Sequence, residues 1–203
     1  MKRKFLLFVT SWFRMPLFPV SIRPRVIVIT IVVCAAAVLR IVPHPMNFSP
    51  IGALALFCGA HFSNRRAAVA IPLLSLIAGD IFVGFHPLMF WVYASFLVSV
   101  AIGLWLRREK SVGRLGVATV AGAIQFFIIT NFAVWAASIG NYPKNAGGLV
   151  ACYLAGLPLL GNTLAGDSFY VALLFGGMAL MEKRVPSLRE PLTAEIVQQS
   201  AVR

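Results

Sequence analysis

Two long apolar runs without a single charged residue constrain the fold of this chain more than any other feature. They cover residues 88–106 and 115–139, and neither contains Asp, Glu, Lys or Arg. A helix needs about 20 predominantly apolar residues to cross the ~30 Å hydrocarbon core of a bilayer. Only 12% of the whole chain is charged, whereas soluble domains carry about 25%. The sequence therefore predicts an all-α, polytopic membrane helix bundle surrounded by a lipid bilayer.

Four further apolar runs complete a predicted domain of six transmembrane helices over residues 26–181. They cover residues 26–42, 51–62, 67–84 and 162–181. The second of these runs would span only about 18 Å as a helix, so we expect it to begin below the membrane surface. Ser49 and Pro50 predict its start, as an N-cap residue followed by a proline at the first helical position.

The two ends of the chain are predicted to lie outside the membrane. Residues 1–25 alternate Lys and Arg with Phe, Leu and Trp, which is typical of a basic amphipathic arm on the cytoplasmic leaflet. The apolar stretch near the start is too short for a secretory signal, and no small-residue cleavage site follows it. Residues 182–203 are polar and form a predicted cytoplasmic tail.

The distribution of basic residues predicts the orientation. With six spans and a cytoplasmic N-terminus, sixteen of the 18 Lys and Arg residues fall inside, and only Arg40 and Lys144 fall outside. This is the asymmetry that the positive-inside rule describes for the bacterial inner membrane. A seventh span at residues 146–160 would put the tail outside, so we interpret that segment as non-spanning, either re-entrant or interfacial. Topology and anionic headgroups explain the net charge of +12 better than a nucleic-acid partner does.

A kinked polar segment, residues 40–50, joins the first two spans. Such backbone is costly in a membrane unless protein buries it or it lines a wet cavity. Asp80 and Asp167 are the only acids within the predicted spans, and a carboxylate there costs about 2.5–3.5 kcal/mol on insertion scales. The unusual polar residues share the outer half of the membrane, and we predict that they bind a ligand: Arg40, His44, Asn47, Asp80, His86, Asn131, Asn162 and Asp167.

Six of these residues are predicted to line one pocket open to the outside: Arg40, Asn47, Asp80, Asn131, Asn162 and Asp167. The free N–H groups at the start of the short helix would attract a carboxylate or phosphate on the ligand. Structural alternatives stay open. Asp80 or Asp167 could form an ion pair with Arg40 that holds helices together, and Asn131 and Asn162 could connect helices by hydrogen bonds. No metal site is predicted, since His44 and His86 lie far apart in sequence and also suit loops.

No catalytic motif is recognisable in the sequence. P-loop, nucleophile-elbow, HExxH and CxxC patterns are missing, and each of the three cysteines lies within an apolar stretch where a small buried side chain is the ordinary role. The leading hypothesis is a small-solute binding or uptake subunit. Whether it uses a cofactor is unknown from the sequence. The alternatives are a structural or assembly membrane protein without a ligand, and an enzyme acting on a membrane-soluble substrate.

Several polar motifs carry a family resemblance: PHPMNFSPIGALALFCGAHF, AGDIFVGFHP, ITNFAVW, NYPKNAGGLVACYLAGLPLLGNTLAGDSFY and LLFGG. With these motifs the chain resembles an uncharacterised bacterial family of six-helix integral membrane proteins. That family is similar in length and layout to the S components of energy-coupling-factor (ECF) transporters. The resemblance implies capture of a small vitamin or metal near the outer face, with a transmembrane coupling protein and ATPases as partners. The Ala-x-x-x-Ala pattern with which S components dock the coupler is missing from the first predicted helix.

Overall fold

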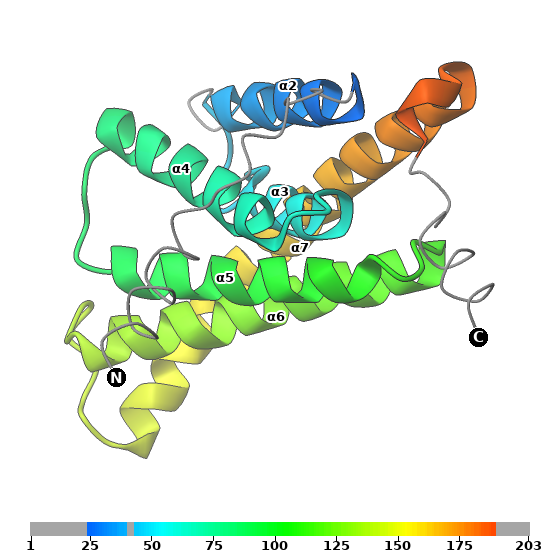
Figure 1. Cartoon of the computed structure of the whole chain (residues 1–203). Helices are drawn as coiled ribbons and strands as arrows, with labels where there is room; N and C mark the ends of the chain where they lie inside the picture. The colour runs from blue at the N-terminus through cyan, green and yellow to red at the C-terminus, as the bar shows by residue number, and fades with distance from the viewer. Residues whose placement is uncertain (1–23, 40–42, 190–203) are drawn as a thin grey trace, which may run out of the picture.

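The structure, a computed structural model, describes residues 24–39 and 43–189. This part of the chain is all-helical and contains no strand. Its elements are α2 (Pro24–Val38), α3 (Ile51–His61), α4 (Arg65–Val83), α5 (Met89–Leu106), α6 (Val112–Ala136), α7 (Ala146–Arg184) and the 3-10 turn η1 (Pro186–Leu188). Successive helices run in alternating directions, so that their connections gather at two opposite ends of the bundle (Figure 1). Three predicted parts lie outside the described residues. They are the arm apart from residues 24 and 25, Arg40, and most of the tail.

Two details of the predicted helix boundaries are wrong. Residues 146–160 and 162–181 are not separate elements, because α7 continues through Pro158 for 39 residues. A proline removes one backbone donor and kinks a helix, but neighbouring helices support it at such a point. At the start of α3, the N-cap is Pro50 rather than Ser49, and no side chain of that segment caps the helix.

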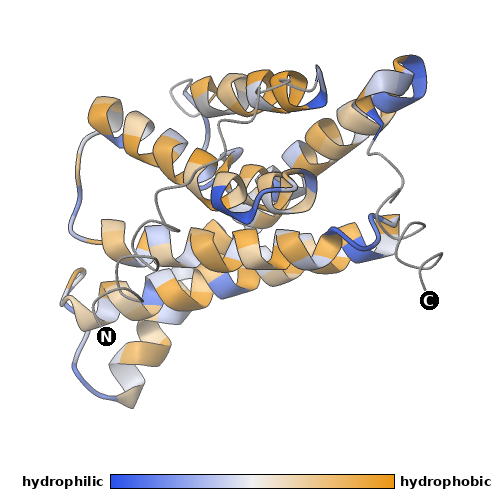
Figure 2. Cartoon of the chain, in the orientation of Figure 1, coloured by the Kyte–Doolittle hydropathy of each residue, from blue (hydrophilic) through white to orange (hydrophobic). Residues whose placement is uncertain are grey.

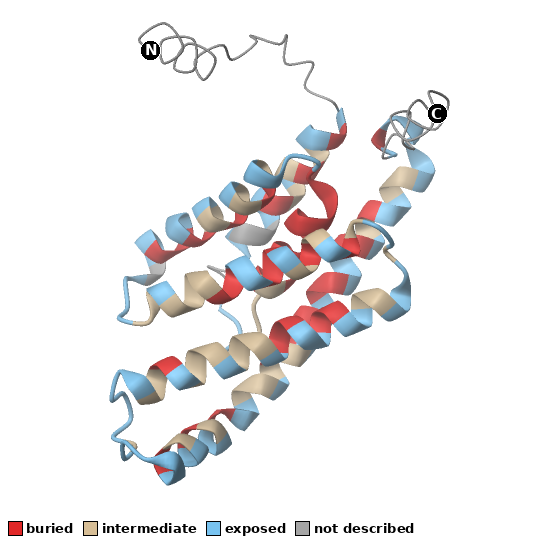
Figure 3. Ribbon diagram, turned by 60° about the horizontal axis from the view of Figure 1, so that its bottom comes forward, coloured by how far each residue is buried: buried red, intermediate tan, exposed pale blue. Residues whose placement is uncertain are grey.

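Helix α3 is the centre of the bundle. All of its residues except Gly52 are buried, and it packs against α2, α4, α5, α6 and α7. Figure 3 shows the buried residues concentrated on α3 and on the helix faces around it. The helix is apolar all round, which is the composition expected of an element with no solvent-facing side.

Two glycines set the closest contact of α3. A Cβ at Gly59 would lie within 3.0 Å of backbone atoms of Val100 and Gly103 on α5. A Cβ at Gly103 would in turn overlap the carbonyl oxygen of Leu56. Small residues allow two helix backbones to approach this closely, and Gly59 and Gly103 provide this contact between α3 and α5.

Helix α6 has small residues on its inner face and large ones on its outer face. Ala118, Gly122 and Ala123 are buried. The exposed stripe is large and β-branched: Val117, Val120, Ile124 and Ile128. Helix α4 exposes Leu74, Ile77 and Ile81 in the same way. Figure 2 shows hydrophobic residues along the outward sides of the helices and hydrophilic ones near their ends. Helices that pack in lipid place small residues between them, whereas soluble proteins rarely expose apolar surfaces of this extent.

Three helices are long and apolar enough to cross a membrane, namely α5, α6 and α7. Helices α2 and α3 are apolar but shorter, and α4 carries two arginines in its first turn. Helix α7 would extend about 58 Å if straight, roughly twice the hydrocarbon thickness of a bilayer. Its first turns therefore have to project beyond one membrane surface or tilt strongly, if the helix crosses once.

The described basic residues gather at one end of the bundle, which we call the basic end. Ten of the eleven described Lys and Arg residues lie there: Arg25, Arg65, Arg66, Arg107, Arg108, Lys110, Arg114, Lys183, Arg184 and Arg189. Only Lys144 lies at the opposite end. An ion pair between Arg25 of α2 and Glu182 of α7, with 2.6 Å between Nη1 and Oε1, joins the first and last described helices at the basic end.

Candidate functional site

A cavity with both polar and aromatic walls lies at the N-terminus of α3, at the other end of that helix from the basic end. Its wall comes from the segment before α3 and from α3, α5, α6 and α7. The lining residues are Asn47, Ser49, Gly52, Phe96, Ser99, Gly122, Phe126, Thr163 and Asp167. Two of the predicted ligand-binding residues, Asn47 and Asp167, are therefore brought together here, although they are far apart in sequence.

The carboxylate of Asp167 caps α3. Asp167 is only 4% exposed, and it accepts a hydrogen bond from the backbone N–H of Ala53 in the first turn of α3. That N–H is one of the donors that a helix leaves unsatisfied at its start, and the positive end of the helix dipole favours a carboxylate there. The sequence predicts that a ligand supplies the anion at this helix start. In the structure, the protein supplies it as the carboxylate of Asp167.

Glycines allow α7 to approach this helix start. A Cβ at Gly52 would come within 3.0 Å of the Asp167 carboxylate. A Cβ at Gly166 would lie 3.0 Å from the Cα of Phe48 and 3.2 Å from the backbone nitrogen of Ser49. Both positions therefore require a residue without a side chain for the contact to keep its present geometry.

The segment before α3 is held in place over the cavity by α7. Asn162 of α7 donates a hydrogen bond from Nδ2 to the carbonyl oxygen of Met46 (2.9 Å). The next residue, Asn47, has a φ of +62°, a left-handed conformation that asparagine tolerates better than most residues. Asn162 thus has the bridging role that the sequence left open, and it positions Asn47 without lining the cavity.

The opposite wall, from α5 and α6, combines one hydroxyl group, that of Ser99, with two aromatic rings. Ser99 accepts a hydrogen bond from Nε2 of Gln125 (2.9 Å). The other side-chain atom of that amide, Oε1, is buried and has no hydrogen-bond partner among the described residues. The rings of Phe96 and Phe126 pack with their centroids 5.6 Å apart. Gln125 itself does not line the cavity, so its amide fixes the Ser99 hydroxyl from behind the wall.

The cavity is small. The centres of water molecules can occupy about 40 Å³ of it, whereas one water needs roughly 10–15 Å³ by the same measure. The space therefore suits a few waters or a solute of a few non-hydrogen atoms. A vitamin-sized molecule would require the helices to separate.

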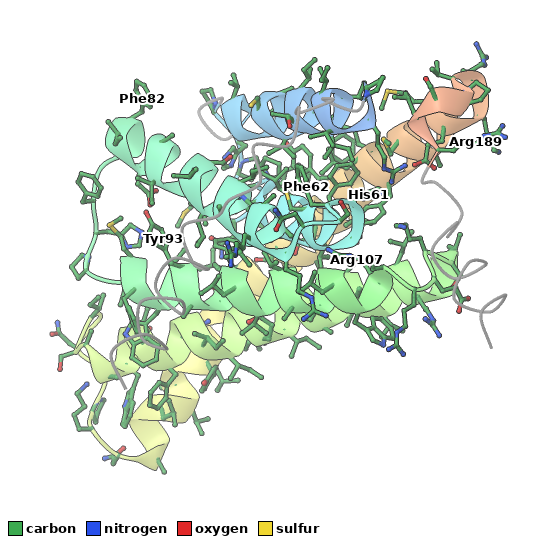
Figure 4. All side chains as sticks on the ribbon, in the orientation of Figure 1. His61, Phe62, Phe82, Tyr93, Arg107 and Arg189 are labelled. Carbon is green, nitrogen blue, oxygen red and sulfur yellow. The ribbon has the colours of Figure 1, made fainter. Side chains whose placement is uncertain are left out.

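The remaining predicted site residues do not line this cavity. Asp80 of α4 accepts a hydrogen bond from the hydroxyl of Tyr93 on α5 (2.6 Å), and Figure 4 shows Tyr93 between these two helices. Asn131 donates to the carbonyl oxygen of Phe127 in its own helix. His44 and His86 are exposed near the ends of helices. Arg40 lies outside the described residues.

Four cavity residues with polar side chains or close backbone contacts were not among the predicted ones: Ser49, Gly52, Ser99 and Thr163. Thr163 lies one helical turn before Asp167, on the same face of α7, so the i, i+4 spacing was a usable signal. Ser99 carried no such signal, because serine also occurs in apolar helices with its hydroxyl bonded to its own backbone. No group of three or more His, Cys, Asp or Glu residues in the described part of the chain is placed to hold a metal.

Comparison with known proteins gives the family of this chain. The sequence model of a family of unknown function (DUF6580) matches residues 20–188. The chain belongs to this family. Neither the curated proteins nor the solved structures contain a match to the chain. The expectation of an uncharacterised family is confirmed, while the similarity to S components, the coupling protein and the ATPases stay predictions.

Proposed function

We propose that this protein is integral to the bacterial inner membrane, with six crossings and its basic end in the cytoplasm. Three observations support this proposal. The outer faces of α4 and α6 are apolar stripes, three helices are long and apolar enough to span, and ten of the eleven described basic residues share one end. In this orientation the cavity at the start of α3 belongs to the outer half of the membrane.

Within this membrane domain, we infer that the cavity binds a small solute with an ammonium or a similar hydrogen-bond donor. The buried carboxylate of Asp167 in a cavity lined with hydroxyl groups carries the inference. A carboxylate at membrane depth attracts a cation and repels an anion, and the faces of Phe96 and Phe126 also suit a cation. We propose further that the protein takes up this solute. An energising module would then bind to other surfaces of the domain.

A second candidate function is structural, and one observation favours it. Asp167 already accepts a hydrogen bond from Ala53, so its carboxylate has a role in the fold without any ligand. The two candidates differ in what the charge does. A cap needs only an acceptor oxygen, whereas a site for a cationic solute needs the negative charge.

The variant Asp167→Asn separates these candidates, because asparagine keeps an acceptor oxygen and removes the charge. The wild-type protein and the variant are purified in a mild detergent and then denatured. The small molecules that each releases are identified by mass spectrometry. We expect an amine-bearing compound from the wild type, reduced at least tenfold for Asp167→Asn, since one lost charge-assisted bond is worth about 1.5–3 kcal/mol.

Asp80→Asn is the matched control. It changes the other buried aspartate, keeps an acceptor for Tyr93 and does not touch the cavity, so we expect it to release the same compound in wild-type amounts. Equal release from all three proteins, or no amine-bearing compound from any of them, would contradict solute binding at Asp167 and favour the structural role.

A further inference from the structure

A second cavity lies at the basic end, where α4 begins and α5 ends. It is lined by Arg65, Leu104, Arg107 and Arg108, and we call it the arginine groove. Three of its four lining side chains are guanidinium groups, and the centres of water molecules can occupy about 240 Å³ of it. This space is several times larger than the cavity at Asp167, and no acidic side chain lines it.

Arg107 is fixed in position by the end of α3. Its guanidinium donates to the carbonyl oxygens of Gly59 and Ser63, each at 3.3 Å, and to that of Phe62. Figure 4 shows Arg107 beside Phe62 at this point. These carbonyls end α3, and a positive charge there complements the helix dipole. The groove therefore has one pre-positioned cation in its wall.

The other two arginines have no comparable partner. Within the described part of the chain, the guanidinium groups of Arg65 and Arg108 make no hydrogen bond or ion pair, and both residues are exposed. Arg65 is also the first residue of α4, where the helix dipole favours negative charge and disfavours positive charge. Helix stability thus does not explain an arginine at this position, whereas an anion in the groove would.

We propose that the arginine groove binds a phosphate group. Guanidinium groups form paired hydrogen bonds with phosphate oxygens, and several arginines around one space are a typical phosphate site. The group belongs either to an anionic phospholipid or to a free phosphate. Leu104 favours the lipid, because a headgroup site at the end of a spanning helix also offers an apolar contact to the glycerol and acyl region. Basic pockets of this kind on the cytoplasmic side recognise anionic headgroups.

The test is native mass spectrometry of the full-length protein in detergent, titrated with dioleoylphosphatidylglycerol or dioleoylphosphatidylcholine. The double variant Arg65→Gln/Arg108→Gln removes the two unpaired guanidinium groups and leaves Arg107 on α3. We expect phosphatidylglycerol affinity to fall about 100-fold, because each guanidinium loses charge-assisted hydrogen bonds to the phosphate that contribute roughly tenfold. The double variant Arg65→Lys/Arg108→Lys, which keeps charge but not paired hydrogen bonds, should lose an intermediate amount.

The charge-matched control is Arg66→Gln/Arg114→Gln, which changes two basic residues at the same end outside the groove. We expect it to lose less than about threefold in affinity. A second arm adds inorganic phosphate to the lipid-bound wild type. If phosphate displaces the lipid, the groove also binds free phosphate. If it does not, the groove binds the phosphate only as part of the lipid.

Two results would overturn the proposal. One is an equal loss of affinity in the glutamine and control variants, which would mean general surface electrostatics only. The other is wild-type binding with no preference for phosphatidylglycerol over phosphatidylcholine. The Asp167→Asn protein should bind phosphatidylglycerol as the wild type does, so that this test and the solute test fail independently.

Discussion

Replacing Gly59 with alanine is expected to lower the free energy of unfolding by about 2–3 kcal/mol, the cost of overpacking a close-packed core. The new Cβ would meet the backbone of Val100 and Gly103 on α5. Backbone atoms cannot rotate away as a side chain can, so α3 and α5 have to separate. Because α3 packs against every other helix, this separation disturbs the whole bundle. The measurement is the midpoint of unfolding in a denaturing-detergent titration, compared with the wild type.

The control for this prediction is Gly176→Ala in α7, where a Cβ would meet nothing within 4 Å. Alanine there should stabilise slightly, by up to about 1 kcal/mol, because of its better helix propensity. Gly103→Ala should resemble Gly59→Ala, since the two glycines face each other. The double variant should cost less than the sum, because helices already separated by one methyl group accommodate the second. Additive costs, or a neutral Gly59→Ala, would contradict the close α3–α5 contact.

Replacing Asp167 with alanine is expected to destabilise the protein by about 1–3 kcal/mol, the cost of a buried donor without a partner. The N–H of Ala53 would lose its acceptor, and α3 would lose the only cap contact found for its first turn among the described residues. Asp167→Asn keeps an acceptor, so we expect its loss to be under about 1 kcal/mol. Thermal unfolding of the three proteins in detergent, without added ligand, measures the difference.

The sign of the Asp167→Ala effect is informative. If the carboxylate served only a ligand, its removal would relieve a buried charge and raise the stability of the ligand-free protein. An increase in the melting temperature of Asp167→Ala would therefore contradict the capping contact. Gly52→Ala gives an independent check, because its Cβ would push the carboxylate away from α3 and should destabilise the protein with Asp167 itself unchanged.

The sequence predicted helix positions well where apolar runs end in clear breaks. The predicted helix at residues 51–62 corresponds to α3, Ile51–His61, because proline precedes it and polar residues follow it. The prediction of two separate segments, residues 146–160 and 162–181, was wrong, because α7 continues through Pro158. Packing partners decide whether a proline ends a helix in such a bundle, and partners cannot be identified from one chain segment.

Which helix each candidate side chain faces could not be predicted from the sequence. Position along a span placed Asp80, Asn131 and Asp167 at one level, and a single hydrophobic sequence says little about which neighbour each side chain faces. Asp167 faces the start of α3, whereas Asp80 faces Tyr93. In a soluble helix, the polar face would indicate the direction. In an apolar helix surrounded by lipid and other helices, this signal is weak.

Two residues at the ends of α3 test most directly the proposal that this helix joins an outward-facing cavity to a cytoplasmic basic end. Met46, in the segment over the cavity, is 72% exposed, and Ser63 is exposed just after α3. Each is replaced by cysteine in a chain whose native Cys34, Cys58 and Cys152 are replaced by alanine. Intact cells are then treated with a membrane-impermeant thiol reagent from outside. We expect the reagent to label Met46→Cys, and to label Ser63→Cys only after the cells are opened. Labelling of Ser63→Cys in intact cells, or of Met46→Cys only in opened cells, would contradict the proposed orientation and with it the outward-facing cavity.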